Sequence, residues 1–279
     1  MEGNKGEYGI DFLCRHYGVS RSGYYAWRRR PESNRSVENR LLLQRIERIY
    51  EKSHKIYGSP RVWAVLRKQG EEFGVNRVAS LMRFAGLQGR VVKVTRRVPG
   101  VQKFYERNEN LRLHKPMPGT INQQWVGDLT YLKTQERACY LATVMDLYSR
   151  RIVGWALGRD RTTKLTCKAL NNAIRQRDPE PGLIFHSDRG VEYGGIKLRD
   201  ILERHGFLAS MSRAYHSQDN AHMESFFHSM KIEWIRGKTF VTMDELKGDL
   251  HRYVRFYNCN RLHSGIGYCS PVEYERKLI

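Results

Sequence analysis

The spacing of apolar residues changes near residue 120, and this change limits the possible folds more than any other feature of the chain. Upstream of it, apolar residues recur at helical intervals in short segments. Downstream, three segments rich in aromatic and β-branched residues follow one another, at 124–133, 138–146 and 151–157. Three such segments joined by short connections predict an antiparallel meander of strands.

The rest of the second half alternates between helical and strand patterns. Helices are expected at 162–177 and 196–205, and short strands at 183–185 and 207–211. A last long helix is expected at 219–236, capped by Asp219 or Asn220. Its inner face is formed by Met223, Phe226, Phe227, Met230 and Trp234. The order βββαβαβ followed by a helix predicts an α/β layer with a mixed sheet.

The first 90 residues predict an all-helical region made of two helix-turn-helix-like units. In the first unit, Ser20 is placed to cap the second helix. In the second unit, Pro60 lies in a first helical turn, where a missing N–H costs nothing. The helices are expected at Asp11–Tyr17, Arg21–Arg30, Asn39–Lys52, from Pro60 to the break at Gly70–Gly74, and at Val75–Gly86.

Residues 91–119 differ from both halves. They contain three of the eight prolines, and the stretch 91–98 is basic and β-prone, which fits a linker and an edge strand followed by a loop equally well. We therefore expect four parts. These are a DNA-binding helical region at 1–90, a basic linker at 91–119, a core at 120–240 and a C-terminal helical extension at 241–279.

The charge balance predicts a polyanionic partner. Lys and Arg number 49 against 29 Asp and Glu, and residues 1–120 hold 25 of the former and 11 of the latter, a net +14 of the total +20. So large an excess in the helical half favours a region that contacts phosphate backbones over an ordinary solvated surface. A membrane surface is the weaker alternative, because no apolar run approaches the roughly 20 residues that span a bilayer.

Cysteine usage and the polar first ten residues argue against a secreted protein, so a cytoplasmic location is expected. The five cysteines contain no CxxC pair. Cys259, His263 and Cys269 offer only three zinc ligands at an unusual spacing, which argues against a zinc site.

Three carboxylates are candidates for chemistry. Asp128 lies in the middle of a predicted strand, where Asp is depleted, and Asp188 directly follows a short apolar strand. Glu224 borders the inner face of the last long helix, and Lys231 shares its stripe two turns on. Oxygen ligands of this kind bind Mg²⁺ or Mn²⁺. Each acid also has an ordinary structural explanation, and Asp146 competes with them as a strand-end carboxylate.

Several motifs, taken in order, carry a resemblance to a known family. Asp188 and Glu224 are separated by 36 positions, the usual interval of that family. The motifs are Val19–Trp27, Tyr57–Arg61 with Val75–Met82, Trp125–Tyr131, His186–Gly190, Asp219–Phe227 with Lys231 and Glu233, and Tyr257-Asn258 with Arg261–Ser264 and Ser270-Pro271. The chain resembles the catalytic subunit of bacterial insertion-sequence transposases related to retroviral integrases. More narrowly, it is similar to the second-frame product of insertion-sequence family three.

The resemblance implies a ribonuclease-H-like integrase catalytic core at 120–240, with Asp128, Asp188 and Glu224 as ligands of two Mg²⁺ or Mn²⁺ ions. It implies cleavage that frees a 3′-hydroxyl at the element's end, followed by transfer of that end to target DNA. The implied partners are double-stranded DNA, further copies of this chain and an upstream-frame subunit, in the bacterial cytoplasm at the nucleoid. The residues expected to bind DNA are Arg21, Arg28, Arg61, Arg77, Arg189 and Lys231.

One segment departs from the family pattern, and two other functions stay open. Residues 212–218 replace the Gly-Asn pair that often precedes Asp-Asn-Ala in the family, which could alter how DNA approaches Glu224. A DNA-binding regulatory or partner subunit would need the basic half without the acids. A metal-dependent nuclease would hydrolyse DNA without joining it.

Overall fold

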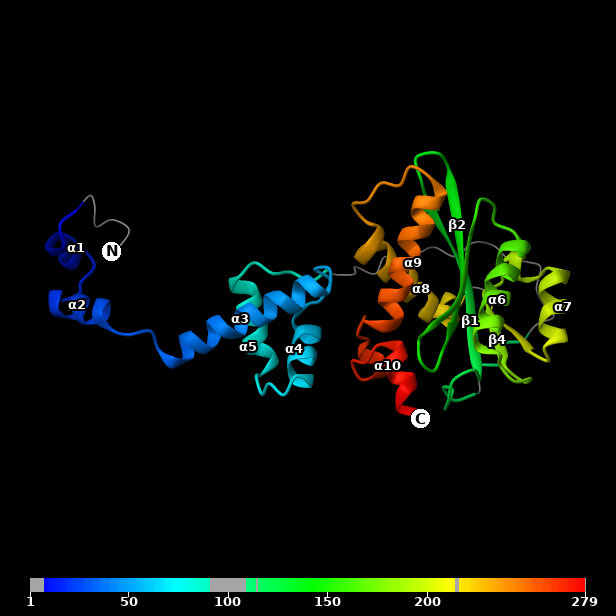
Figure 1. Cartoon of the computed structure of the whole chain (residues 1–279), viewed down its shortest axis with the longest axis horizontal. Coiled ribbons are helices and arrows are strands. Elements are labelled where there is room, and N and C mark those ends of the chain that lie inside the picture. The colour runs from blue at the N-terminus through cyan, green and yellow to red at the C-terminus, as the bar shows by residue number, and fades with distance from the viewer. Residues whose placement is uncertain (1–7, 91–108, 114, 214–215, 279) are drawn as a thin grey trace.

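A helical N-terminal part and a larger part built on one β-sheet make up the structure (Figure 1). The structure is a computed structural model that describes residues 8–90, 109–113, 115–213 and 216–278, without the side chains of residues 217 and 218. The strand or linker predicted at 91–98 lies outside these residues. None of the helices in the described ranges combines the length and apolar character that crossing a bilayer requires.

Side-chain caps set the starts of the helices in the N-terminal part. Ser20 caps the second helix as predicted, because its Oγ accepts a hydrogen bond from the Gly23 N–H at 3.0 Å. The third helix begins earlier than expected, since Ser33 caps it through the Ser36 N–H. The five helices are α1 (Ile10–His16), α2 (Arg21–Arg29), α3 (Asn34–Lys52), α4 (Ser59–Lys68) and α5 (Val75–Phe84).

The sheet has five strands in the order β3-β2-β1-β4-β5. The first three form the predicted antiparallel meander, and the last two run parallel to β1, so the predicted mixed sheet is confirmed. The strands are β1 (Gln124–Lys133), β2 (Ala138–Asp146), β3 (Ile152–Gly158), β4 (Ile184–Ser187) and β5 (Leu208–Met211). The bounds of β1 and β2 match the prediction at both ends.

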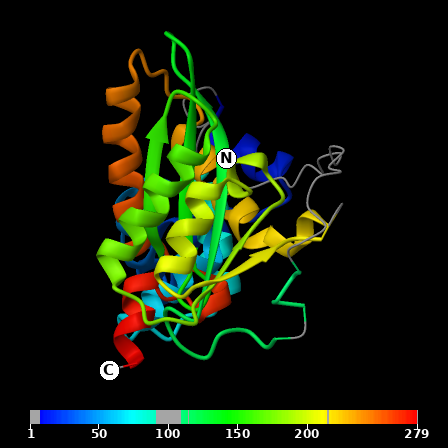
Figure 2. The same cartoon turned by 90° about the vertical axis from the view of Figure 1, so that its right-hand side faces the viewer.

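Helices cover both faces of the sheet (Figures 1 and 2). On one face lie α6 (Thr163–Arg177) and α7 (Ile196–Arg204), and on the other lie α8 (Ala221–Met230) and α9 (Met243–Cys259), followed by α10 (Pro271–Glu275). Successive strand residues point to opposite faces, so Trp125 and Val126 belong to two different apolar clusters. The helix expected at 219–236 is divided, because a π-helix at Lys231–Ile235 follows α8.

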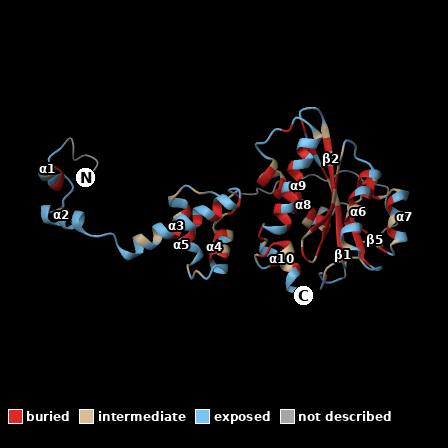
Figure 3. Ribbon diagram, viewed as in Figure 1, coloured by how far each residue is buried: buried red, intermediate tan, exposed pale blue. Residues whose placement is uncertain are grey.

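The unit formed by α3, α4 and α5 shares an apolar core with the C-terminal part of the chain. Tyr57 joins the two, because its hydroxyl donates to the Asn260 carbonyl at 2.8 Å and accepts from the Leu262 N–H at 3.0 Å. Arg61 adds a bond from its Nε to the Leu262 carbonyl at 3.0 Å. In contrast, α1 and α2 lie apart from the sheet and are mostly exposed (Figures 1 and 3).

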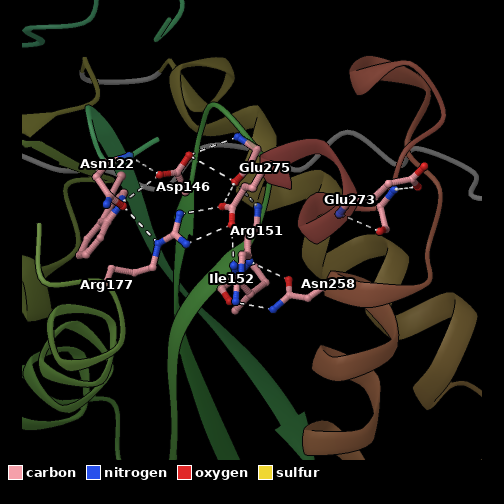
Figure 4. A network of polar contacts seen from close by, with 11 residues as sticks. Asn122, Asp146, Arg151, Ile152, Arg177, Asn258, Glu273 and Glu275 are labelled. Atoms are coloured by element: carbon pink, nitrogen blue, oxygen red, sulfur yellow. Dashed lines mark hydrogen bonds and ion pairs between the residues drawn. The ribbon is translucent and has the colours of Figure 1, made fainter. Parts of the chain in front are cut away.

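The C-terminal helices are tied to the sheet by buried polar groups (Figure 4). The Asn258 side chain accepts from the Ile152 N–H and donates to the Ile152 carbonyl, both at 2.9 Å. The Glu275 carboxylate accepts from Ser149, Arg151 and Arg177, and these bonds connect α10 to the β2–β3 turn and to α6.

Replacing Glu275 with Gln should destabilise the protein at neutral pH by about 3 kcal/mol, because the buried carboxylate loses its charge and two half-buried guanidinium groups lose their ionic partner. Burial alone would raise the pKa of Glu275, but Arg177, Ser149 and Arg151 hold it below its ordinary 4.5. The unfolded state therefore binds a proton first, and this part of the stability is present above pH 4.5 and lost as the pH falls below it. Chemical denaturation between pH 3 and pH 7 measures both effects.

Glu273→Gln provides the matched control for that experiment. Glu273 pairs with Lys68 at 2.6 Å, but both side chains are about 40% exposed, at 43% and 40%. An exposed pair contributes only about 0–1 kcal/mol. If both variants lost the same free energy of unfolding, the Glu275 network would contribute no more to stability than an exposed ion pair.

Candidate active site

The parallel pairing of β1 with β4 brings two of the predicted acids together. The register of the β1–β4 pair ends with Gly127 opposite Ser187. Asp128 and Asp188 are the next residues along the two parallel strands, so they lie side by side. Backbone N–H groups fix both carboxylates. The Leu129 N–H donates to Asp128 Oδ1 at 2.7 Å, and the Gly190 N–H donates to Asp188 Oδ1 at 3.0 Å.

The start of α8 brings the third acid to the same region. The Asn220 side chain donates to the Gly127 carbonyl at 3.4 Å, which anchors the residue before α8 directly beside Asp128. Glu224 lies in the first turn of α8 and is exposed, while Met223 next to it is fully buried. The apolar face of α8 thus holds the helix on the sheet and leaves Glu224 at its border, as its spacing predicted.

Electrostatics confirm that the acids are neighbours. Burial raises the pKa of Asp128 well above its ordinary value, and the charges of Asp188, Glu224 and Glu192 raise it further. Burial also raises the pKa of Asp188, against the hydrogen bond from Gly190. In the described part of the chain, however, no three Asp, Glu, His or Cys side chains are gathered closely enough to hold a metal ion. The acids therefore share one region without forming a coordination sphere.

A fourth carboxylate, Glu192, was not singled out by the sequence. It is 2% exposed, and its Oε1 accepts two hydrogen bonds from Arg161, at 2.9 Å and 2.7 Å. Its Oε2 is buried without a hydrogen-bond partner among the described residues. The one available signal was its place four residues after Asp188, within the same loop.

Two glycines permit this close packing. A Cβ on Gly127 would lie 2.7 Å from the ring of Phe185, and a Cβ on Gly190 would lie 2.5 Å from Glu192 Oε1. Both distances are shorter than any ordinary carbon contact. A larger residue at position 127 or 190 would therefore have to displace the Phe185 ring or the Glu192 carboxylate next to the acids.

The competing acid, Asp146, has a structural role. It is fully buried, and its Oδ2 accepts from the Asn122 N–H at 2.7 Å and from the Trp125 indole at 3.3 Å. Its Oδ1 accepts from the N–H groups of Tyr148 and Ser149. These donors occupy both oxygens and fix the turn between β2 and β3 (Figure 4).

The residues expected to bind DNA do not form one surface. Arg21 pairs with Asp11 at 2.8 Å, and Arg77 pairs with Glu38 at 3.0 Å, so both join neighbouring helices. Arg28 lies in the last turn of α2 and is exposed. Their contacts with DNA stay a prediction.

The other three expected residues lie nearer the acids. Arg189 directly follows Asp188, and its Nε donates to the Ser212 carbonyl at 2.7 Å. Lys231 opens the π-helix after α8 and is half-buried, and Arg61 lies where α4 meets the C-terminal part.

The segment 212–218, which departs from the family pattern, is described only in part, since residues 214 and 215 lie outside the described ranges. Arg213 pairs with Asp219 through its side chain at 3.1 Å and also through its backbone N–H at 3.0 Å. Asp219 therefore fixes this segment, and it does not cap α8 as one prediction had it; Asn220 holds the N-cap position without a side-chain capping bond.

Comparisons with known proteins agree with this architecture. Integrase core domain families match residues 120–217 and 224–279, and an HTH-like domain family matches residues 36–95. The chain is 36% identical over 284 residues to transposase InsF for insertion sequence IS3A of Escherichia coli, covering 99% of this chain and 97% of that protein. It is also 36% identical over 266 residues to an uncharacterized 31 kDa protein of insertion element IS600 from Shigella sonnei, covering 95% and 98%.

A solved structure shares the fold. The chain is similar to a chain of the simian T-cell lymphotropic virus intasome in complex with PP2A regulatory subunit B56 gamma, with a TM-score of 0.51 and 12% identity. The match covers 82% of this chain and 74% of that one. Fold and matches together define an integrase-type catalytic core preceded by a helix-turn-helix-like domain. The chain belongs to the IS3 family of insertion-sequence transposases, and it acts in DNA transposition and integration as a polynucleotidyl transferase.

Replacing Asp128 with Asn should stabilise the metal-free protein at pH 7, whereas Asp146→Asn should destabilise it. Asp128→Asn removes a buried charge that faces other carboxylates, and we expect the thermal midpoint to rise by about 2–4 °C. Asp146→Asn replaces an acceptor oxygen with a donor, which costs about 1–3 kcal/mol. Thermal unfolding in EDTA compares the two variants.

The size of the Asp128→Asn effect also depends on pH. Because the folded pKa is raised, protonation relieves the repulsion, so the advantage of the Asn variant should shrink as the pH falls through that pKa. An Asp128→Asn protein that melts below wild type at pH 7 would show that the carboxylates do not repel one another in the folded state.

Proposed function

We propose that Asp128, Asp188 and Glu224 hold divalent cations, Mg²⁺ or Mn²⁺ and two of them, and that this site cleaves DNA at the ends of the insertion sequence and joins the freed 3′-ends to target DNA. The observation that carries the proposal is the placement of Asp128 and Asp188 at the same edge of the β1–β4 pairing, with the first turn of α8 anchored to Gly127.

The donor set fits such cations. The three side chains present hard oxygen ligands, the kind that Mg²⁺ and Mn²⁺ prefer. Burial and the mutual repulsion of the acids raise the pKa of Asp128, and a bound cation would offset that repulsion. Arg161 is the basic residue whose charge lowers the pKa of Asp188, and it is already paired with Glu192 at 2.7 Å.

The chain's own residues prepare the site for phosphoryl transfer. The Leu129 and Gly190 N–H groups hold the Asp128 and Asp188 carboxylates in place before DNA arrives. Glu224, on the exposed border of α8, is the acid free to move toward them. When bound, the cations supply activation of a water or 3′-hydroxyl and stabilisation of the leaving oxygen. Lys231, two turns after Glu224, is placed to hold a phosphate on the same stripe.

The partners follow from charge and family. We propose that the chain binds double-stranded DNA at the element's ends and at the target, as a homo-multimer, with an upstream-frame subunit as a possible further component. The net charge of +14 over residues 1–120 supports the DNA contacts of the helical half. The nucleoid in the bacterial cytoplasm is the site of action that these partners imply.

Two other functions make different predictions for the same protein. A regulatory subunit without chemistry would bind DNA with steep salt dependence and show no cation-dependent cleavage. A nuclease would cleave ends but would leave a supplied pre-cleaved 3′-end unjoined.

Asp188→Asn should abolish both end cleavage and joining in Mg²⁺, with a loss of at least about 100-fold, because it removes one oxygen ligand from the proposed set. Gel assays with a labelled element end, either intact or pre-cleaved, measure the two steps separately. Mg²⁺ should also raise the thermal midpoint of the wild type, and this shift should be absent in the variant.

Asp200→Asn serves as the control, since Asp200 is an exposed residue of α7. It should keep both activities and the Mg²⁺-dependent shift. Undiminished joining by Asp188→Asn would remove Asp188 from the ligand set.

A further inference from the structure

A polar cavity of about 390 Å³ lies where the α3–α5 unit meets α8 and the C-terminal segment. We refer to it as the arginine cavity, because Arg61, Arg90, Arg150 and Arg261 all line it. Two sequence motifs that the proposed active site does not use, Tyr57–Arg61 and Arg261–Ser264, meet at this place.

The arginine cavity is separate from the three acids. One side of α8 forms part of the cavity wall, through His222, Ser225 and Ser229. These residues are three and four positions apart, a spacing that places them on the same side of a helix. At about 100° per residue, the apolar face centred on Met230 lies between this side and Glu224. The helix thus carries the acid along one border of its buried face and the cavity along the other.

The cavity holds more positive charge than its own residues neutralise. Glu233 is the single carboxylate among its described lining residues. Both its oxygens accept from Arg261, at 2.7 Å and 2.6 Å, and Arg61 forms a longer ion pair with it at 3.9 Å. Three further guanidinium groups line the same space. Burial lowers the pKa values of Arg61 and Arg150, and the charge of Arg261 lowers that of Arg61 further. Crowding cations in a partly buried space is unfavourable unless an anion joins them.

The ring of His263 also lines the cavity. His263 Nδ1 lies 3.2 Å from Arg261 Nη1, and because a guanidinium group only donates, Nδ1 must accept. Burial lowers the pKa of His263 to about 2, so the ring is neutral and its Nε2 carries the proton. This Nε2 forms no bond of regular geometry among the described residues, although a hydrogen bond with the backbone of Tyr257 raises the pKa of the ring against the effect of burial. The neutral ring therefore adds no charge to the cavity, and among its described lining residues the arginines alone set its positive potential.

The backbone of Arg150 indicates that its side chain is needed here. Its φ of 64° lies in the left-handed region, which glycine adopts without strain and arginine does not. The guanidinium contacts His222 Nδ1, and no described carboxylate forms an ion pair with it. Five other described non-glycine residues share this left-handed backbone, so the observation specific to Arg150 is its charged side chain at the cavity without a carboxylate partner among the described residues.

We propose that the arginine cavity binds a phosphate group of the DNA backbone. Planar guanidinium groups recognise phosphate oxygens through paired N–H donors, and the Ser225 and Ser264 hydroxyls add neutral donors at the exposed rim. The proposal rests on the proposed function, in which DNA is the substrate. A DNA backbone is favoured over a free phosphate because the cavity is lined both by the helix-turn-helix-like unit and by α8, the two elements that the proposed function assigns to DNA.

The test uses the full chain in EDTA and a short duplex of arbitrary sequence. Arg150→Gly removes the guanidinium and suits the left-handed backbone, so its thermal midpoint should stay close to that of wild type. Its affinity for the duplex should fall about tenfold for every sequence, and the slope of log affinity against log salt should decrease by about 1. Ser264→Asp, which adds a negative charge at the rim, should weaken binding in the same manner.

Two controls decide between the outcomes. Arg159→Gln removes an exposed charge outside the cavity and should leave the affinity nearly unchanged; an equal loss there would overturn the proposal in favour of general charge attraction. A second arm adds inorganic phosphate. If it raises the thermal midpoint of wild type but not of Arg150→Gly, while both bind the duplex equally, the cavity takes a free anion and the DNA proposal is overturned.

The outcome does not depend on the active-site proposal. The binding measurements contain no metal ion, and Asp200→Asn, which changes an exposed acid of α7, should bind the duplex as wild type does. Loss of binding in Arg150→Gly together with inactive chemistry in wild type would support the cavity and overturn the active site, and the converse result would do the opposite. If neither the duplex nor phosphate distinguishes Arg150→Gly from wild type, the arginines are a structural cluster alone.

Discussion

The parallel pairing of β1 with β4 is the constraint on which the rest of the structure depends. It sets Asp128 beside Asp188, and it brings the Phe185 ring of β4 so close to Gly127 that a Cβ there would lie 2.7 Å from the ring. The same edge receives the start of α8 through Asn220. A shift of one residue in this register would turn every side chain of the short strand β4 to the opposite face, and the acids would be separated.

Two buried aspartates on neighbouring strands show how surroundings decide the role of a side chain. Asp146 is surrounded by N–H donors and therefore stabilises a turn. Burial raises the pKa of both acids, but Asp128 receives only one such bond and also faces other carboxylates, which raise its pKa further. A cation bound as proposed above would offset this unfavourable charge at the edge of the sheet.

Local patterns predicted the elements well, and contacts between distant residues escaped them. The strands β1 and β2 follow from aromatic and β-branched runs, and Ser20 was recognised as a cap because its partner is three residues away. The three acids were predicted only with the help of the family resemblance, because the sequence alone did not exclude Asp146. The place of Glu192 four residues after Asp188 was the one signal that it lies nearby, and no pattern predicted its burial. No spacing indicated that Tyr57 would bond to residues 260 and 262. Such contacts depend on tertiary packing, which a local pattern does not contain.

The bonds of Tyr57 have a consequence for how the chain matures on the ribosome. The apolar side of the α3–α5 unit is completed by residues that are synthesised about 200 positions later. Until the last segment leaves the ribosome, the apolar surface of the α3–α5 unit stays exposed. Transiently exposed apolar surface makes a folding chain prone to aggregate. A copy of the gene that stops before the last 20 residues would therefore yield a poorly folded product, not a shorter DNA-binding protein that competes with the intact one.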